Sequence, residues 1–206
     1  QQIDYRTGVR VLDAKRWPTP IRQDQFRQVT GEADFPQDLR PWVRNGQLDY
    51  YGNNSVHYTV RGMHVQLETL WNWEAPEGSG DVYEAAFQGT RARAEIRQGK
   101  QENYRPELYV APNSPELRDD VFAALKKAVA GLQRRWPGLD VALGAGEVRI
   151  VIPEQHRVSH EAHFAQVSNA FFGYLRDPKS LPVWEKSNML VKYFVTTTGV
   201  ELGRGR

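Results

Sequence analysis

The spacing of apolar residues changes along the chain, and these changes limit the folds that the chain can adopt. Between residues 47 and 110 apolar side chains recur at every second position, as at Val56, Tyr58 and Val60, which is typical of half-buried β-strands. Over residues 114–136 and 159–176 they recur every three or four positions, which is typical of amphipathic helices, while residues 139–152 return to a period of two. Strands joined by short loops must be antiparallel neighbours. The sequence therefore predicts an α+β fold in which antiparallel strands precede helices.

Turn and cap residues divide this pattern into expected elements. Strands are expected over residues 9–17, 48–51, 56–60, 63–74, 82–88, 92–97, 107–110, 139–143 and 148–152. Helices are expected over residues 23–29, 36–43, 114–136, 159–176 and 186–195. Pro18 and Pro20 are expected to end the first strand, because proline has no backbone N–H. Gly52-Asn53-Asn54 predicts a turn, because these residues tolerate positive φ.

The composition excludes several classes of protein. With 40% hydrophobic residues the 206-residue chain can bury a substantial core, so disorder is excluded. Basic and acidic residues are interspersed and the formal net charge is only +2, which argues against a nucleic-acid partner. There is no cysteine for a disulfide or a thiolate zinc site. No apolar run approaches the ~18 residues of a membrane span, so no membrane partner is expected.

Two motifs, one glycine-rich and one basic, are interpreted as structural features rather than binding sites. Gly144-Ala145-Gly146 has the first glycines of a dinucleotide fingerprint, but it joins two expected strands instead of opening a helix, so it is interpreted as a turn. A basic run of Arg91, Arg93, Arg97 and Lys100 is interrupted by Glu95 and Glu102. We interpret this run as the polar face of a strand, with a polyanion site as the alternative.

The densest cluster of chemically active residues is Ser159-His160-Glu161-Ala162-His163. On a helix His160 and His163 lie on neighbouring positions of one face, where both could contact a substrate or ligate a metal. A zinc-protease motif needs histidines four residues apart, whereas these are three apart. The alternative is that both are polar residues at the end of the apolar helix face.

The tryptophans Trp71 and Trp73 also allow two interpretations. Flat aromatic rings stack on sugars, so exposed tryptophans would favour a carbohydrate-binding module. However, Trp71 and Trp73 continue the expected strand face of Met63, Val65 and Leu67. We therefore favour a place in the core.

Four segments in combination resemble one family. They are residues 73–81 (WEAPEGSGD), 97–104 (RQGKQENY), 160–164 (HEAHF) and 184–193 (WEKSNMLVKY). Together they resemble the C-terminal domain of oxidoreductases of the glucose–fructose oxidoreductase, inositol dehydrogenase and MocA family. The resemblance covers nearly the whole chain in order.

The resemblance implies a fold and a function. The fold is a large, open, mainly antiparallel sheet with helices on one face, as in the C-terminal domains of dihydrodipicolinate reductase and glyceraldehyde-3-phosphate dehydrogenase. Residues 1–206 would form one domain that binds substrate and mediates oligomerisation. The full-length protein would use NAD or NADP to oxidise or reduce a sugar, cyclitol or related polyol. Its partners would be its own N-terminal Rossmann domain and, through the open sheet face, further copies of itself.

Substrate-contacting residues are expected among the side chains that can hydrogen-bond hydroxyl groups. These are His160, His163, Arg97, Lys100 and Tyr104. No catalytic, cofactor-binding or metal-binding residue can be assigned by matching, because the glycine-rich fingerprint, the family's Glu-Lys-Pro lysine and its Asp-x-x-x-His pair have no counterpart.

The beginning of the chain supports an excised domain. It starts at Gln1 without a methionine, so we expect the missing motifs upstream and no cofactor binding or activity in this chain alone. The alternatives are a non-catalytic carbohydrate-binding or structural module and, less well supported, a metal-dependent hydrolase. The sequence does not distinguish a cytoplasmic protein from one exported to the periplasm.

Overall fold

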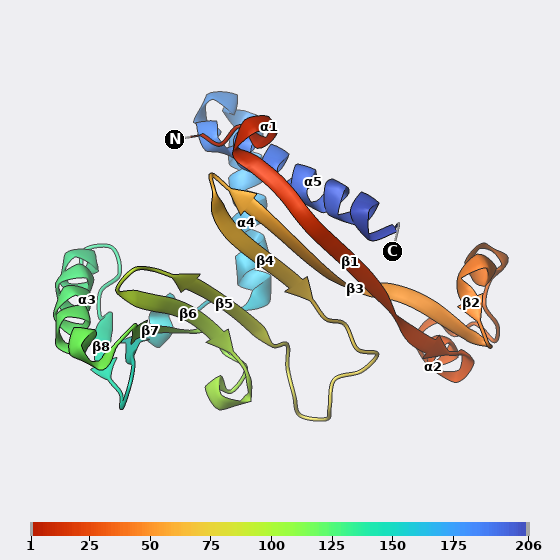
Figure 1. The fold of residues 1–206 in the computed structure, drawn as a ribbon, viewed down its shortest axis with the longest axis horizontal. Helices are drawn as coiled ribbons and strands as arrows, with labels where there is room; N and C mark the ends of the chain where they lie inside the picture. Colours follow the sequence, from red (N-terminus) through yellow and green to blue (C-terminus); the bar gives the residue numbers. More distant parts are fainter. Residues whose placement is uncertain (1, 205–206) are drawn as a thin grey trace. The chain divides into compact units, whose positions relative to one another are not determined.

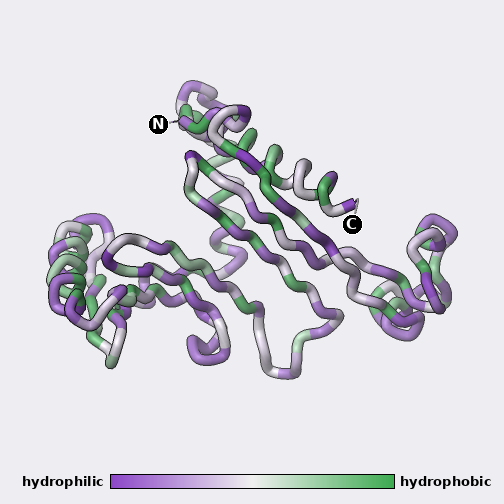
Figure 2. The backbone as a smooth tube through the Cα atoms, viewed as in Figure 1, coloured by the Kyte–Doolittle hydropathy of each residue, from purple (hydrophilic) through white to green (hydrophobic). Residues whose placement is uncertain are grey.

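The computed structural model describes residues 2–204 and divides them into two compact units. The first contains the residues up to Glu74 and those from Gly173 onward, and the second contains Ala75–Phe172. Each unit has its own antiparallel sheet (Figure 1). Along the strands hydrophilic and hydrophobic residues alternate (Figure 2), which is the two-residue period that the sequence predicts.

The first unit holds a four-stranded sheet and helix α5. Strands β1 and β2 lie on either side of β3, and β4 also pairs with β3. The elements are α1 (Tyr5–Gly8), β1 (Val9–Arg22), α2 (Gln23–Thr30), the 3-10 helix η1 (Gln37–Trp42), β2 (Val43–Arg44), β3 (Gln47–Val60), β4 (Met63–Thr69), the 3-10 helix η5 (Pro178–Ser180) and α5 (Val183–Arg204).

Helix α5 packs against β1 and β3. Val195 on α5 joins Val9, Ala14 and Val56 in a buried cluster. The contact is close because Gly199 has no side chain: a Cβ there would lie 3.0 Å from Cγ2 of Val56. Burial of this apolar face, rather than helix propensity, holds the helix in place.

A second cluster of the first unit contains both tryptophans of the expected strand. Trp71 and Trp73 pack against the buried residues Ile21, Phe35 and Leu48. The strand β4 ends at Thr69, so the tryptophans follow the strand instead of lying within it. Their place in the core is confirmed.

Two predicted breaks in the strands of the first unit, at Pro18 and Pro20 and at Gly52-Asn53-Asn54, are wrong. The strand β1 continues through Pro18 and Pro20 to Arg22. It is paired on one side only, and an edge strand tolerates residues that lack an N–H. The pairing also shifts register between Trp17 and Thr19, so that a bulge accommodates the first proline.

Gly52-Asn53-Asn54 lies within β3 instead of forming a turn. The amide of Asn53 is 4% exposed and makes tertiary hydrogen bonds. Its Nδ2 donates to Oγ1 of Thr19 at 2.8 Å and its Oδ1 accepts from the backbone N of Trp71 at 2.7 Å. These contacts to distant segments override the local turn preference.

The second unit holds a five-stranded sheet in the order β5-β6-β7-β9-β8. Its elements are β5 (Tyr83–Gln88), β6 (Ala92–Gln98), the 3-10 helix η2 (Lys100–Glu102), β7 (Glu107–Pro112), the 3-10 helix η3 (Pro115–Leu117), α3 (Arg118–Leu132), β8 (Asp140–Leu143), β9 (Val148–Val151) and the 3-10 helix η4 (Glu154–His156). Helix α4 (His160–Arg176) begins in this unit and ends in the first.

Helix α3 covers one face of the five-stranded sheet. Val129 on α3 is buried with Val141, Val148 and Ile150 from β8 and β9. Gly144 and its neighbours form the turn between these two strands, in which Gly144 N donates to Glu147 O at 2.8 Å. The interpretation of this glycine pair as a turn is therefore confirmed.

The α+β class with antiparallel sheets and helices is confirmed. The strands form two sheets instead of one large sheet, since the Pro- and Gly-containing segment between β4 and β5 adopts no strand structure. That residues 1–206 form a single domain stays a prediction. Within residues 2–204, no helix combines the length and apolar character that spanning a bilayer requires.

Candidate functional site

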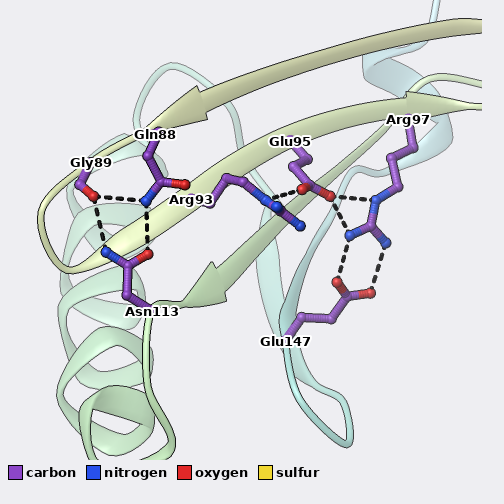
Figure 3. A network of polar contacts seen from close by, with 7 residues as sticks. All are labelled: Gln88, Gly89, Arg93, Glu95, Arg97, Asn113 and Glu147. Carbon is purple, nitrogen blue, oxygen red and sulfur yellow. Dashed lines mark hydrogen bonds and ion pairs between the residues drawn. The ribbon is translucent and has the colours of Figure 1, made fainter.

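The candidate site is the face of the five-stranded sheet opposite α3. On β6 the residues Ala94 and Ile96 point to the α3 side, so Arg93, Glu95 and Arg97 share the other side. Figure 3 shows these three side chains in one polar network with Glu147. The interpretation of the alternating basic run as the polar face of a strand is confirmed.

Glu95 is the buried centre of this network. It is 3% exposed, and its carboxylate forms ion pairs with Arg93 and Arg97. Nε of Arg97 donates to Oε2 of Glu95 at 2.6 Å. A carboxylate removed from water at this depth requires such compensation. The two arginines therefore make the burial of Glu95 possible.

Arg97 links this centre to the β8–β9 turn. Its Nη1 and Nη2 donate to the two carboxylate oxygens of Glu147 at 3.0 and 2.7 Å, which is the two-pronged geometry that guanidinium favours. Its Cζ also lies 4.4 Å from the centre of the Tyr109 ring, within cation–π range. The hydrogen bonds that Arg97 donates to Glu147 and Glu95 raise the pKa of Arg97 above its usual value.

The ring of Tyr109 packs against Arg97 of the network. Its hydroxyl lies 3.5 Å from Oε1 of Glu102, the outer limit of a hydrogen bond. Burial raises the pKa of Tyr109 above 10.0, and the negative charges of Glu102 and Glu107 raise it further. The phenol therefore keeps its proton in neutral and mildly alkaline solution.

A second ion pair lies on the same face beside Arg97, because Glu107 is the partner of Arg97 in the β6–β7 register. Nη2 of Arg157 donates to Oε1 of Glu107 at 2.6 Å, and Nη1 donates to the backbone oxygen of Pro106 at 3.0 Å. The side chains of Arg157 and Glu107 are only 17% and 13% exposed. The pair fixes the segment before α4 to the start of β7.

The charges of this face limit its chemistry. Arg93 and Arg97 are balanced by Glu95 and Glu147, so the network carries no excess positive charge for a polyanion. Its hydrogen-bonding groups are held rigidly by one another, which suits positioning of neighbouring groups rather than proton transfer. Within the described residues no cluster of three or more His, Asp or Glu side chains is placed to hold a metal ion.

Three of the expected site residues lie at one end of this face. Arg97 is engaged with Glu95 and Glu147, as described above. Lys100 is exposed at the start of η2, and Tyr104 follows η2 with a φ of 57°. The ring of Tyr104 packs against the chain at Gly80, where a Cβ would lie 3.1 Å from Cγ of Tyr104.

The two expected histidines lie in the first turn of α4 and are exposed. The His160 ring packs against Phe164, with centroids 4.8 Å apart. Among residues 2–204 no hydrogen bond, ion pair or ring contact links His160 or His163 to Arg97, Lys100 or Tyr104. The two histidines and the group of Arg97, Lys100 and Tyr104 therefore make no direct contact with each other.

Sequence reasoning missed the partners that fix Arg97 and Arg157. Glu147 and Glu107 each lie 50 residues from their arginine, so no local pattern pairs them. The sequence contained one signal of this network. Glu95 lies two residues from Arg93 and two from Arg97, so all three side chains lie on one face of the strand.

Among the described residues no glycine-rich turn opens a helix, and the fold consists of antiparallel sheets with helices. The sequence matches the family model "Putative oxidoreductase C terminal domain" over residues 1–204. The chain therefore belongs to this family of oxidoreductase C-terminal domains. No curated protein matches the sequence.

A solved structure is similar over the whole chain. It is the crystal structure of a putative oxidoreductase from Parabacteroides merdae ATCC 43184, with 36% sequence identity and a TM-score of 0.93. The similarity covers 100% of this chain and 47% of that one. The chain thus spans about half the length of the relative that it matches.

Proposed function

We propose that this chain is the substrate-side and oligomerisation domain of an NAD(P)-dependent oxidoreductase of the glucose–fructose oxidoreductase, inositol dehydrogenase and MocA family. The observation that carries the proposal is the match over residues 1–204 to an oxidoreductase C-terminal domain. The matched part is 47% of the related bacterial chain, which leaves room for a nucleotide-binding domain in the remainder of that chain.

The residues of this chain do not fit a dinucleotide. Pyrophosphate binding in a Rossmann domain needs a glycine-rich turn that opens a helix. The closest match, Gly144-Ala145-Gly146, instead connects strands β8 and β9. NAD or NADP would therefore bind to a preceding Rossmann domain and supply the hydride chemistry.

The proposed substrate is a sugar, cyclitol or related polyol. Lys100, His160 and His163 are exposed and carry groups that hydrogen-bond hydroxyls. Arg97 is already held by two carboxylates, so we assign it a positioning role towards Tyr109 and the η2 segment. Tyr104 is proposed to contact substrate through its hydroxyl group while its ring rests on Gly80.

Self-association is proposed through the polar sheet faces that no helix of the same unit covers. In the first unit the face opposite α5 carries Lys15, His57, His64 and Gln66. A Gln66→Arg change would place a charge in such an interface and lower the molar mass seen by light scattering. The matched change Gln28→Arg on α2 would leave that mass unchanged.

The decisive experiment is a titration of this chain and of the protein encoded by the complete gene with NADH and NADPH, followed by nucleotide fluorescence. We expect saturable binding only by the complete protein. Micromolar binding by residues 1–206 alone would overturn the proposal, and so would its absence in both proteins. In the complete enzyme Lys100→Ala and the double change His160→Ala, His163→Ala should raise KM more than they lower kcat.

A further inference from the structure

Two histidines of the first unit face each other across neighbouring strands. Nε2 of His57 on β3 lies 2.9 Å from Nδ1 of His64 on β4. The ring centres are 5.1 Å apart and the ring planes meet at 37°. His57 is half-buried and His64 is exposed, so solvent and ions reach the pair.

The strand register creates this pair. In the β3–β4 ladder His57 is opposite Gln66, and His64 is opposite Thr59. The two histidines are therefore diagonal neighbours on the same face, a distance that long or ring side chains can bridge. Because β3 is paired on both sides, its backbone holds His57 in place, and little conformational freedom remains to be lost when a ligand binds.

The distance between the two nitrogens matches that of two ligands on one metal ion. Imidazole nitrogens bind zinc at about 2.0–2.1 Å, so two of them at a tetrahedral angle are roughly 3.3 Å apart. At the right angle of a square-planar copper or nickel site the separation is roughly 2.9 Å. The two nitrogens now face each other in a hydrogen bond, so both rings would have to turn outward to direct their lone pairs to one ion.

We propose that His57 and His64 form a binding site for a divalent late first-row transition metal ion such as Ni²⁺ or Zn²⁺. The ion replaces the proton that the two nitrogens share in the hydrogen bond. Neutral imidazole is a strong ligand for these ions, whereas Mg²⁺ and Ca²⁺ prefer oxygen. The proposal does not depend on the cofactor or substrate of the oxidoreductase, but His57 and His64 lie on the face proposed above for self-association, so the metal site is a site of the separate chain.

Because His57 and His64 supply only two ligands, the other coordination positions of the metal ion are open to water or an added ligand. Among residues 2–204 no third His, Asp or Glu completes a ligand cluster. Asp13 on β1 is paired with His57 in the β1–β3 ladder, so a carboxylate lies on the neighbouring strand and favours a cation nearby.

The test is calorimetric titration of the tag-free protein with Ni²⁺ and Zn²⁺ at pH 7.5, with Mg²⁺ as the comparison ion. We expect saturable one-to-one binding of Ni²⁺ and Zn²⁺ and none of Mg²⁺. His57→Gln and His64→Gln should each weaken binding by at least about tenfold, as loss of a ligand does. The bound ion should also raise the Tm, because it binds only the folded strand pair.

The matched control is the double variant His160→Gln, His163→Gln, which also removes two imidazoles. It should bind both ions as the unchanged protein does. His64 lies on an exposed edge strand, so His64→Gln tests the site even if His57→Gln fails to fold. Absence of saturable binding, or binding that survives loss of His64 and disappears in the control variant, would overturn the proposal.

Discussion

Arg97 and Glu147 join strand β6 to the β8–β9 turn through two parallel hydrogen bonds of 3.0 and 2.7 Å. The side chains are 28% and 32% exposed, so water screens this pair less than it screens the surface pairs. Loss of Glu147 would leave Arg97 with Glu95 alone and would release the turn.

We expect Glu147→Gln to lower the free energy of unfolding by about 1–2 kcal/mol, because the variant loses the charge and one of the two acceptors. Urea denaturation at pH 7 measures the change. Glu154→Gln is the matched control: Glu154 pairs with Arg105 but is 78% exposed, so the loss should be clearly smaller than in Glu147→Gln. Equal losses in the two variants would contradict a structural role for the Arg97–Glu147 pair.

Asn53 is expected to be the most sensitive asparagine of β3. Asn53→Ala removes the bonds to Thr19 and to the backbone N of Trp71 and leaves both groups without this partner. We expect a loss of roughly 2–3 kcal/mol in thermal or urea unfolding. The neighbouring Asn54→Ala should cost under about 1 kcal/mol, since Asn54 makes no side-chain hydrogen bond in the described structure.

Glycines in α5 and α3 should respond to alanine in opposite directions. In Gly199→Ala the new methyl group would lie 3.0 Å from Val56, so we expect destabilisation by about 1–2 kcal/mol despite the gain in helix propensity. Gly131 in α3 has no neighbouring atom within 4 Å of such a methyl group. Gly131→Ala should therefore stabilise the protein by about 0.5–1 kcal/mol, seen as a higher Tm.

Tyr109 should make stability depend on alkaline pH. Burial and the charges of Glu102 and Glu107 raise its pKa above 10.0 in the folded state, so the folded protein holds this proton more tightly than the unfolded chain does. This contribution is complete below pH 10 and is lost as the pH rises through the folded-state pKa.

The variant Tyr109→Phe lacks this ionisation. Its free energy of unfolding should fall less steeply than that of the unchanged protein above pH 10, as measured by urea denaturation at several pH values. Below pH 9 the difference between the two proteins should be constant. A parallel decline of both proteins above pH 10 would rule out the shifted phenol.

The α+β class could be predicted from the sequence because burial of one face repeats apolar residues at a regular spacing. That spacing can be recognised within a short stretch of sequence. The strands β5 and β6 and helix α4 were predicted in this way, with α4 within one residue of its bounds. The turn expected at Asn53 was wrong because its amide is satisfied by Thr19 and Trp71, which are distant in sequence. Hydrogen bonds between residues that are distant in sequence cannot be recognised from a short stretch of sequence.

The candidate site was predicted only in part for a related reason. Arg97 was expected to contribute because of its charge and its strand position. Its partner Glu147 is brought to it by the order of strands β6, β7 and β9, which the sequence does not specify. That His57 and His64 meet follows in the same way from the β3–β4 register.

The prolines of β1 affect how this protein can meet other chains. An exposed strand edge invites addition of a foreign strand, which begins many aggregation reactions. Pro18 and Pro20 offer no N–H to such a strand, and the bulge between Trp17 and Thr19 bends the backbone away from a regular ladder. An added strand would therefore lack hydrogen-bond donors at Pro18 and Pro20, which protects this edge against unlimited strand addition.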